Sequence, residues 1–228
     1  MSWSSGKDAA YALYKLQQAK EYQIHALFCT LDEEKNRVSM HGIHESLLDA
    51  QAKSLNLPLE KLYLPKNLSM EDYGAIMKAE LLKLKNQDIH GFAFGDILLE
   101  DIKTYREEQL ATVKMDAVFP LWKENTKELA REMIDSGLKA IVVAINHKVL
   151  DDSFIGRSFD EEFLNDLPEN VDPCGENGEF HTFVYDGPNF QYPIAFESGD
   201  VVERSYASDS ETDESWDTSF LFQELLLK

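Results

Sequence analysis

The first residues that could do chemistry form the turn Ser4-Ser5-Gly6-Lys7-Asp8, which lies between a short apolar start and a predicted helix. A helix that begins at such a turn offers unpaired backbone N–H groups and a partial positive charge, and both favour a bound phosphate. The serines can donate hydrogen bonds, the glycine allows close approach, and the lysine can neutralise a departing pyrophosphate. Asp8 is suited to hold Mg²⁺ or to orient the turn. The turn therefore predicts a polyphosphate site.

A helix cap explains the same residues without any ligand, because Ser5-x-x-Asp8 is also the pattern of an ordinary capping box. A Walker A loop is excluded, since Asp8 follows Lys7 and no glycine lies upstream of Gly6. The phosphate cradle and the capping box both stay open on these residues alone.

A second candidate group follows a predicted strand at residues 89–94. Gly95 lies at the carboxyl end of that strand, where open α/β sheets bind their ligands, and it could let an adenine approach. Asp96 could hold ribose or a metal ion, and Arg106 could clamp a phosphate or a carboxylate. A turn glycine followed by a helix-capping aspartate is the alternative. His41 is predicted to contact the nucleotide.

A third candidate group lies in the loop at residues 172–183, with the sequence DPCGENGEFHTF. Two glycines that flank Glu176 and Asn177 predict a tight loop that points polar groups into a shared space. The alternative is a hairpin whose charges are incidental. Cys174 is predicted to be a buried thiol.

Composition restricts the class of protein. The 228 residues carry a formal net charge of −20, which argues against nucleic acid as the main partner. No apolar run reaches the roughly 20 residues that span a bilayer, and no signal peptide is present, so we expect a cytoplasmic protein with no membrane partner. Cys29 and Cys174 form no CxxC pair, so neither a zinc site nor a disulfide framework is indicated.

The alternation of apolar segments predicts an α/β fold with a doubly wound, mostly parallel sheet and a smaller C-terminal α+β lobe. Strand 139–145 is rich in β-branched residues and is expected to be central or well covered. We place the boundary between the lobes after residue 122, which divides the chain into residues 1–122 and 123–228. Helices are expected at 6–20, 45–55, 70–85, 125–136 and 161–167, and strands at 22–30, 59–65, 89–94, 117–120, 139–145, 194–197, 201–206 and 219–227. The acidic run at residues 209–217 is expected to be solvated.

The turn at residues 4–8 resembles the PP-loop, Ser-Gly-Gly-x-Asp-Ser, of the ATP pyrophosphatases, which split ATP into AMP and pyrophosphate. Ser5 replaces a glycine of that pattern, and Ala9 replaces a serine that usually touches phosphate. Several further stretches, in this order, make nearly the whole chain similar to the diphthine-ammonia ligase (diphthamide synthetase) family of PP-loop ATPases. They are WSSGKDAA, MHG, FGDI, YREE, PLW and DPCGENGEFHTFVYDGP, and the last of them is the most specific.

The resemblance implies a fold of the HUP, adenine nucleotide alpha-hydrolase-like type, with residues 1–122 binding ATP and residues 123–228 carrying the acceptor pocket. It implies that the turn at residues 4–8 holds the ATP phosphates near Gly95 and Asp96. We expect Lys7, Asp8, Glu176 and Glu179 to act in catalysis. The residues expected to bind the acceptor are Arg106, Glu176, Asn177, Gly178, Glu179 and His181.

The implied reaction uses ATP, Mg²⁺ and ammonium to amidate the carboxylate of diphthine on elongation factor 2, or of a diphthine-like acceptor, with release of AMP and pyrophosphate. A PP-loop enzyme that amidates or thiolates another small molecule is one alternative. A nucleotide-binding sensor without turnover is the other, and Ala9 and the short first strand favour it. Whether the chain forms a homodimer is left open.

Overall fold

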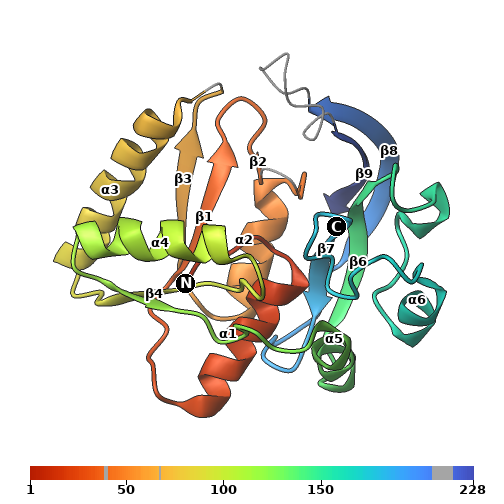
Figure 1. The fold of residues 1–228 in the computed structure, drawn as a ribbon, viewed down its shortest axis with the longest axis horizontal. Coiled ribbons are helices and arrows are strands. Elements are labelled where there is room, and N and C mark those ends of the chain that lie inside the picture. The colour runs from red at the N-terminus through yellow and green to blue at the C-terminus, as the bar shows by residue number, and fades with distance from the viewer. Residues whose placement is uncertain (39–40, 67, 207–217) are drawn as a thin grey trace.

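An N-terminal part with two small sheets and a C-terminal part with one larger sheet lie side by side in the computed structural model, which describes residues 1–38, 41–66, 68–206 and 218–228 (Figure 1). In the N-terminal part, β1 (Leu27–Asp32) pairs in parallel with β3 (Leu59–Leu64) and antiparallel with the short β2 (Arg37–Val38). A second parallel pair joins β4 (Gly91–Ala93) to β5 (Asp116–Val118). The α/β class is therefore confirmed, with parallel and antiparallel sheets in one chain.

The first residues of the chain connect the two parallel pairs. Ser2 forms a parallel bridge with Phe28 of β1, and its N–H donates to the carbonyl of Ala93 in β4 at 2.8 Å. Trp3 N–H donates to the carbonyl of Phe28, also at 2.8 Å. The parallel segments therefore follow the order β3, β1, residues 1–3, β4, β5. This order places the turn that follows Trp3 in the middle of the carboxyl edge.

Helices cover both faces of these parallel segments. Successive side chains of a strand point to opposite faces, so each face carries apolar residues that must be covered. Phe28 and Phe92 pack with Leu81 and Leu84 of α3 (Met70–Asn86), in a cluster that also holds Leu110 of α4 (Glu100–Thr112). Their neighbours on the strands, Leu27, Cys29 and Ala93, belong to another cluster, with α1 (Lys7–Ala19) and α2 (Glu45–Ser54).

The C-terminal part is a four-stranded antiparallel sheet in the order β7-β6-β9-β8. Strand β6 (Lys139–Asn146) is internal and buried from Ala140 to Ile145, which confirms the expectation for this β-branched segment. The other elements of this part are α5 (Thr126–Asp135), η1 (Asp152–Phe154), α6 (Glu161–Asp166), β7 (Phe180–Asp186), β8 (Phe196–Tyr206) and β9 (Thr218–Leu227).

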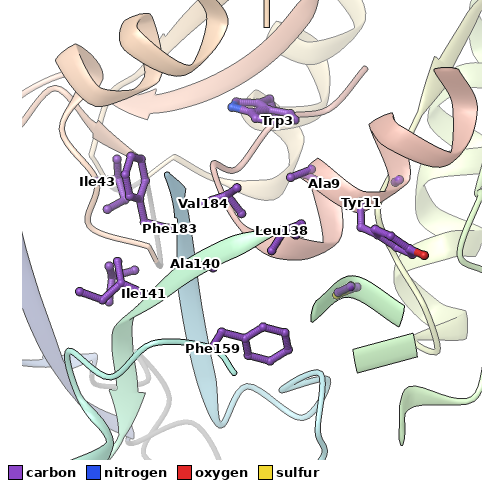
Figure 2. Packing of buried hydrophobic residues seen from close by; sticks show 14 of the residues in the cluster. Trp3, Ala9, Tyr11, Ile43, Leu138, Ala140, Ile141, Phe159, Phe183 and Val184 are labelled. Atoms are coloured by element: carbon purple, nitrogen blue, oxygen red, sulfur yellow. The ribbon is translucent and has the colours of Figure 1, made fainter. Parts of the chain in front are cut away.

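The N-terminal and C-terminal parts share one large cluster of buried apolar residues. Trp3 and Ala9 belong to the same buried cluster as Ile141, Phe183 and Val184 of the C-terminal sheet (Figure 2). The backbone joins the parts as well, since Val184 N–H donates to the carbonyl of Ser5 at 3.0 Å. The turn at residues 4–8 is thus built against the second sheet.

Three expectations for the elements need correction. The strand expected at 22–30 begins only at Leu27, because the polar residues before it are mostly exposed. The strand β2 was not expected from its two residues. The strands expected at 194–197 and 201–206 are one strand, β8, in which an irregularity between Ser198 and Val201 absorbs Gly199 and Asp200. The acidic run at residues 209–217 lies outside the described residues. No helix in the described part is long and apolar enough to cross a membrane.

Candidate active site

A cavity of about 690 Å³ opens where the carboxyl edge of the parallel segments meets the C-terminal sheet. Its wall includes residues from all three groups that the sequence predicted. These lining residues are Ser4, Lys7, Asp8, His41, Gly95, Asp96, Arg106, Glu176, Gly178 and His181. Four predicted residues, Ser5, Gly6, Asn177 and Glu179, do not line it. The fold therefore brings together segments more than 170 positions apart in the sequence.

The turn at residues 4–8 is not a capping box. Gly6 is the N-cap of α1, and no side chain caps the helix. Gly6 N–H donates to Ser4 Oγ at 3.3 Å, and Lys7 N–H donates to Thr182 Oγ1 at 3.0 Å. Two backbone N–H groups that an anion could use are thus already bonded inside the protein.

Ser5 adopts a backbone conformation that favours glycine, with φ of +74°. Its backbone carbonyl accepts hydrogen bonds from Val184 N–H and from Gln51 Nε2. Its hydroxyl is buried and has no hydrogen-bond partner in the described part of the chain. The serine that replaces the PP-loop glycine therefore keeps the backbone shape of the glycine.

Lys7 is a buried cation at the junction of the two parts, with 2% of its side chain exposed. Its Nζ pairs with Asp8 Oδ1 at 2.9 Å, donates to the carbonyl of Cys174, and lies 5.2 Å from the ring centre of Phe180. Burial works against its charge, but the neighbouring carboxylates of Asp8 and Glu176 outweigh it and raise the pKa of Lys7. A permanent positive charge therefore faces the cavity.

Gly95 provides close packing at the end of β4. A Cβ atom there would lie 2.8 Å from the backbone nitrogen of Ala9 and 2.8 Å from the carbonyl carbon of Asp8. Only glycine lets this end of β4 approach the first turn of α1. Gly95 also lines the cavity, as its predicted role near the nucleotide requires.

Asp96 and Arg106 form an ion pair on the cavity wall, with 2.8 Å between Oδ2 and a guanidinium nitrogen. Burial and the nearby Asp8 carboxylate raise the pKa of Asp96 despite the charge of Arg106. The Arg106 guanidinium also stacks over Phe94 at 4.3 Å from the ring centre. Asp96 is not a helix cap, because α4 has Leu99 at its N-cap and no side-chain cap.

Glu176 and Glu179 lie in the same loop but have opposite environments. Glu179 is 3% exposed, and its carboxylate accepts hydrogen bonds from Asp172 N–H, Asn177 N–H and Asn177 Nδ2, all at 2.9 to 3.0 Å. These hydrogen bonds hold Glu179 to the preceding residues of the same loop. Glu176 lines the cavity and accepts one hydrogen bond, from Leu98 N–H at 3.1 Å. Burial and the Asp8 carboxylate raise the pKa of Glu176 to about 7.

His41 and His181 stack on the same wall, with ring centres 4.7 Å apart. Burial lowers the pKa of His41 to about 4 and lowers that of His181 well below its usual value. The positive charge of Lys7 adds to both shifts. Both imidazoles are therefore neutral near pH 7.

Comparison with known proteins matches both parts of the chain. The model of the diphthamide synthase N-terminal domain matches residues 1–115, and that of the diphthamide synthase C-terminal domain matches residues 125–220. The chain belongs to the diphthamide synthase family. The family resemblance seen in the motifs is therefore confirmed.

Curated relatives of this member of the diphthamide synthase family carry the name diphthine–ammonia ligase. The proteins of Homo sapiens and Mus musculus are 28% and 29% identical to it over 226 residues, which cover 89% of this chain and 84% of each relative. The protein of Schizosaccharomyces pombe is 29% identical over 157 residues, which cover 67% of this chain but 25% of that relative.

Several residues of the site were not predicted. Thr182 orients the start of α1 through its hydroxyl, and Tyr73, Tyr105 and Gln109 line the cavity from α3 and α4. Thr182 and Tyr105 lie inside two of the stretches that carry the family resemblance, EFHT and YREE, so their positions were a usable signal. Tyr73 and Gln109 had no such signal.

Two expectations about site chemistry can be compared with the structure of this diphthamide synthase family member. Cys174 is buried, as expected, and burial raises the pKa of its thiol so far that it stays protonated. Within the described ranges, no group of three or more His, Cys, Asp or Glu side chains could hold a metal ion.

Proposed function

We propose that this chain is an ATP-dependent ligase that adenylates the carboxylate of diphthine, or of a diphthine-like acceptor, and transfers ammonia to it. AMP and pyrophosphate are the other products. The observation that carries the proposal is the single cavity in which Lys7 and Asp8 face Glu176 and His181. Family membership and the names of the relatives support the same reaction.

The proposed fold of residues 1–122 is the doubly wound, HUP type, and residues 123–228 form the acceptor lobe. The order of the parallel segments and the helices on both faces support the first part of this proposal. In such folds ligands bind outside the carboxyl ends of the strands. The cavity lies at that edge.

Adenylation is needed because the oxygen of a free carboxylate is a poor leaving group. An acceptor carboxylate oxygen attacks the α-phosphorus of ATP, and the bond from that phosphorus to pyrophosphate breaks. Lys7 stabilises the charge that develops on the pyrophosphate, since its ammonium is buried and already oriented by Asp8 and Cys174. This role does not require Lys7 to give up its proton.

Mg²⁺ fits the site only as an ion shared with the nucleotide. Magnesium is commonly held by one or two carboxylates together with substrate phosphates. Asp8 lines the cavity and is the carboxylate that we propose for this contact. The bound ion would supply further neutralisation of phosphate charge.

Glu176 is proposed to receive ammonium and take its proton. A carboxylate attracts the cation, and a pKa raised to about 7 makes Glu176 a stronger base than an ordinary glutamate. Glu179 is proposed to act indirectly, by holding the loop that carries Glu176. We further propose that the enzyme acts in the cytoplasm.

The test combines the purified protein with labelled ATP, Mg²⁺, ammonium and elongation factor 2 that carries diphthine. We expect AMP and pyrophosphate in amounts that depend on the acceptor, and Asp8→Ala should abolish both products. Asp101→Asn, at an exposed aspartate of α4, is the matched control and should behave like the wild type.

Other outcomes separate the alternatives. Formation of ADP would contradict adenylation. Binding of ATP without any product, with the diphthine acceptor and with a cell extract, would favour the nucleotide sensor. Product formed with the extract but not with the diphthine protein would point to a different carboxylate.

A further inference from the structure

The stacked histidine pair lies where the turn, the acceptor loop and the C-terminal sheet meet. His41 follows β2, and His181 is the second residue of β7. Their ring planes are inclined by 34°, and a Cβ atom on Gly6 would lie 2.8 Å from His41 Cε1. The pair therefore borders the same space as the first turn of α1.

Each neutral imidazole of the pair keeps one ring nitrogen that can accept a hydrogen bond. His41 Nδ1 lies 3.2 Å from the carbonyl oxygen of Thr182. A carbonyl can only accept, so Nδ1 carries the hydrogen and Nε2 keeps a lone pair. His181 Nε2 is buried and has no hydrogen-bond partner within the part of the chain that the structure describes. A buried nitrogen of this kind is costly unless a ligand pairs with it.

The surroundings of the pair favour a neutral ligand over a cation. Lys7 holds a permanent charge near both rings and opposes a second positive charge there. Phe220 stacks on the other side of His181, at 6.3 Å between ring centres. A carboxylate would also fit poorly beside His41, because the His41 Nδ1 hydrogen is already used by Thr182. A small neutral molecule that donates hydrogen bonds fits these surroundings.

We propose that His41 and His181 form the subsite that holds neutral ammonia, with His181 Nε2 as the acceptor of one of its hydrogens, an inference that rests on the ligase function proposed above. Ammonia donates to the imidazole nitrogens and keeps its lone pair for the acyl carbon. The site thus continues from Glu176, which removes the proton of ammonium, to the histidine pair, which positions the product of that step.

Transfer of ammonia exchanges one bond of the acyl carbon for another. The ammonia nitrogen forms a bond to the acyl carbon of the adenylated acceptor, and the bond between that carbon and the AMP oxygen breaks. AMP leaves with the electron pair of the broken bond. The nitrogen in the adduct is cationic and releases one proton to solvent. His181 stays neutral beside Lys7 and acts only as a hydrogen-bond acceptor that positions the ammonia.

Two substitutions of His181 separate its chemistry from its packing. His181→Phe keeps an aromatic ring against His41 and Phe220 but removes the ring nitrogens. His181→Gln keeps an acceptor near the position of Nε2. His44→Asn is the matched control, since His44 caps α2 by accepting from Ser46 N–H, and asparagine is a good cap.

Each variant is assayed for amide formation on the diphthine acceptor at varied ammonium, and for acceptor-dependent exchange of pyrophosphate into ATP. We expect His181→Phe to lower amide formation roughly 100-fold and to raise the KM for ammonium, with exchange unchanged. His181→Gln should recover most of that loss, and His44→Asn should match the wild type.

Three results would overturn the ammonia site while leaving the ligase function intact. They are an equal loss of exchange and amide formation in His181→Phe, a raised KM for the acceptor in place of that for ammonium, and unchanged amide formation. Absence of acceptor-dependent exchange in the wild type would instead refute the ligase function and the ammonia site with it.

Discussion

The turn at residues 4–8 and the loop at residues 172–183 meet at the cavity, yet they are held in different ways. The turn depends on this second segment. Thr182 Oγ1 accepts a hydrogen bond from the backbone N–H of Lys7, and the Cys174 carbonyl accepts one from the side-chain ammonium of Lys7. The loop depends on itself, through the buried carboxylate of Glu179. Thr126 also bonds to Asp172 and Cys174, and the loop and the start of β7 place Glu176 and His181 on the cavity wall. The turn that is proposed to bind phosphate is therefore not an independent module.

The largest effect is expected from Lys7→Met, which removes the buried charge on the turn side. The loss of an oriented charge at the leaving group lowers the rate of adenylation by roughly 1,000-fold. Pyrophosphate release in the presence of acceptor measures it. Lys15→Met, which removes a partly exposed lysine of α1, is the control. A loss below tenfold would show that Lys7 only joins the two parts of the fold.

Glu179→Gln should act on the loop side and mainly on stability. The amide nitrogen of glutamine would face an N–H donor, and we expect a loss of about 2 to 3 kcal/mol in the free energy of unfolding. Thermal and denaturant unfolding measure it. Glu176→Gln should not lower stability and should raise it at neutral pH, because the pKa of the Glu176 carboxyl is raised in the folded protein and its charge therefore costs stability. Equal losses in the two variants would erase the proposed difference between them.

The pH dependence of amide formation and of stability tests the difference between Glu176 and Glu179 further. Its pKa of about 7 in the folded protein predicts that the rate of amide formation rises as pH increases through 7, when the carboxylate becomes available as a base. Glu176→Gln should lower the rate by roughly 100-fold and remove this limb. The pKa is raised above its ordinary value of 4.5, so Glu176 destabilises the folded state as pH rises from about 4.5 to 7. The variant should lack this loss, which unfolding measured at several pH values would detect.

The sequence predicted which segments form the site, and it failed to separate their roles. Gly95, Glu176 and the turn at residues 4–8 were found because motifs in a fixed order define where strands end and loops begin. The division between Glu176 and Glu179 could not be predicted, since it depends on which carboxylate meets Asp172 and Asn177 in three dimensions. The hydrogen bond from Lys7 N–H to Thr182 could not be predicted either, because those residues are 175 positions apart in the sequence.

Ser5→Gly gives the smallest effect and separates backbone shape from hydroxyl chemistry in the turn. A glycine adopts φ of +74° without strain, and the change also removes a buried hydroxyl that has no partner in the described residues. Both effects stabilise the fold, by about 1 kcal/mol, although the more flexible unfolded chain offsets part of this. Because Ser5 does not line the cavity, the more stable variant should bind ATP as tightly as the wild type, and calorimetric titration with a non-hydrolysable ATP analogue in Mg²⁺ measures this. Weaker binding would mean that the hydroxyl donates to phosphate. Unchanged affinity together with higher stability would mean that Ser5 serves the turn only through its backbone, and the turn would then hold phosphate through Ser4 and Lys7.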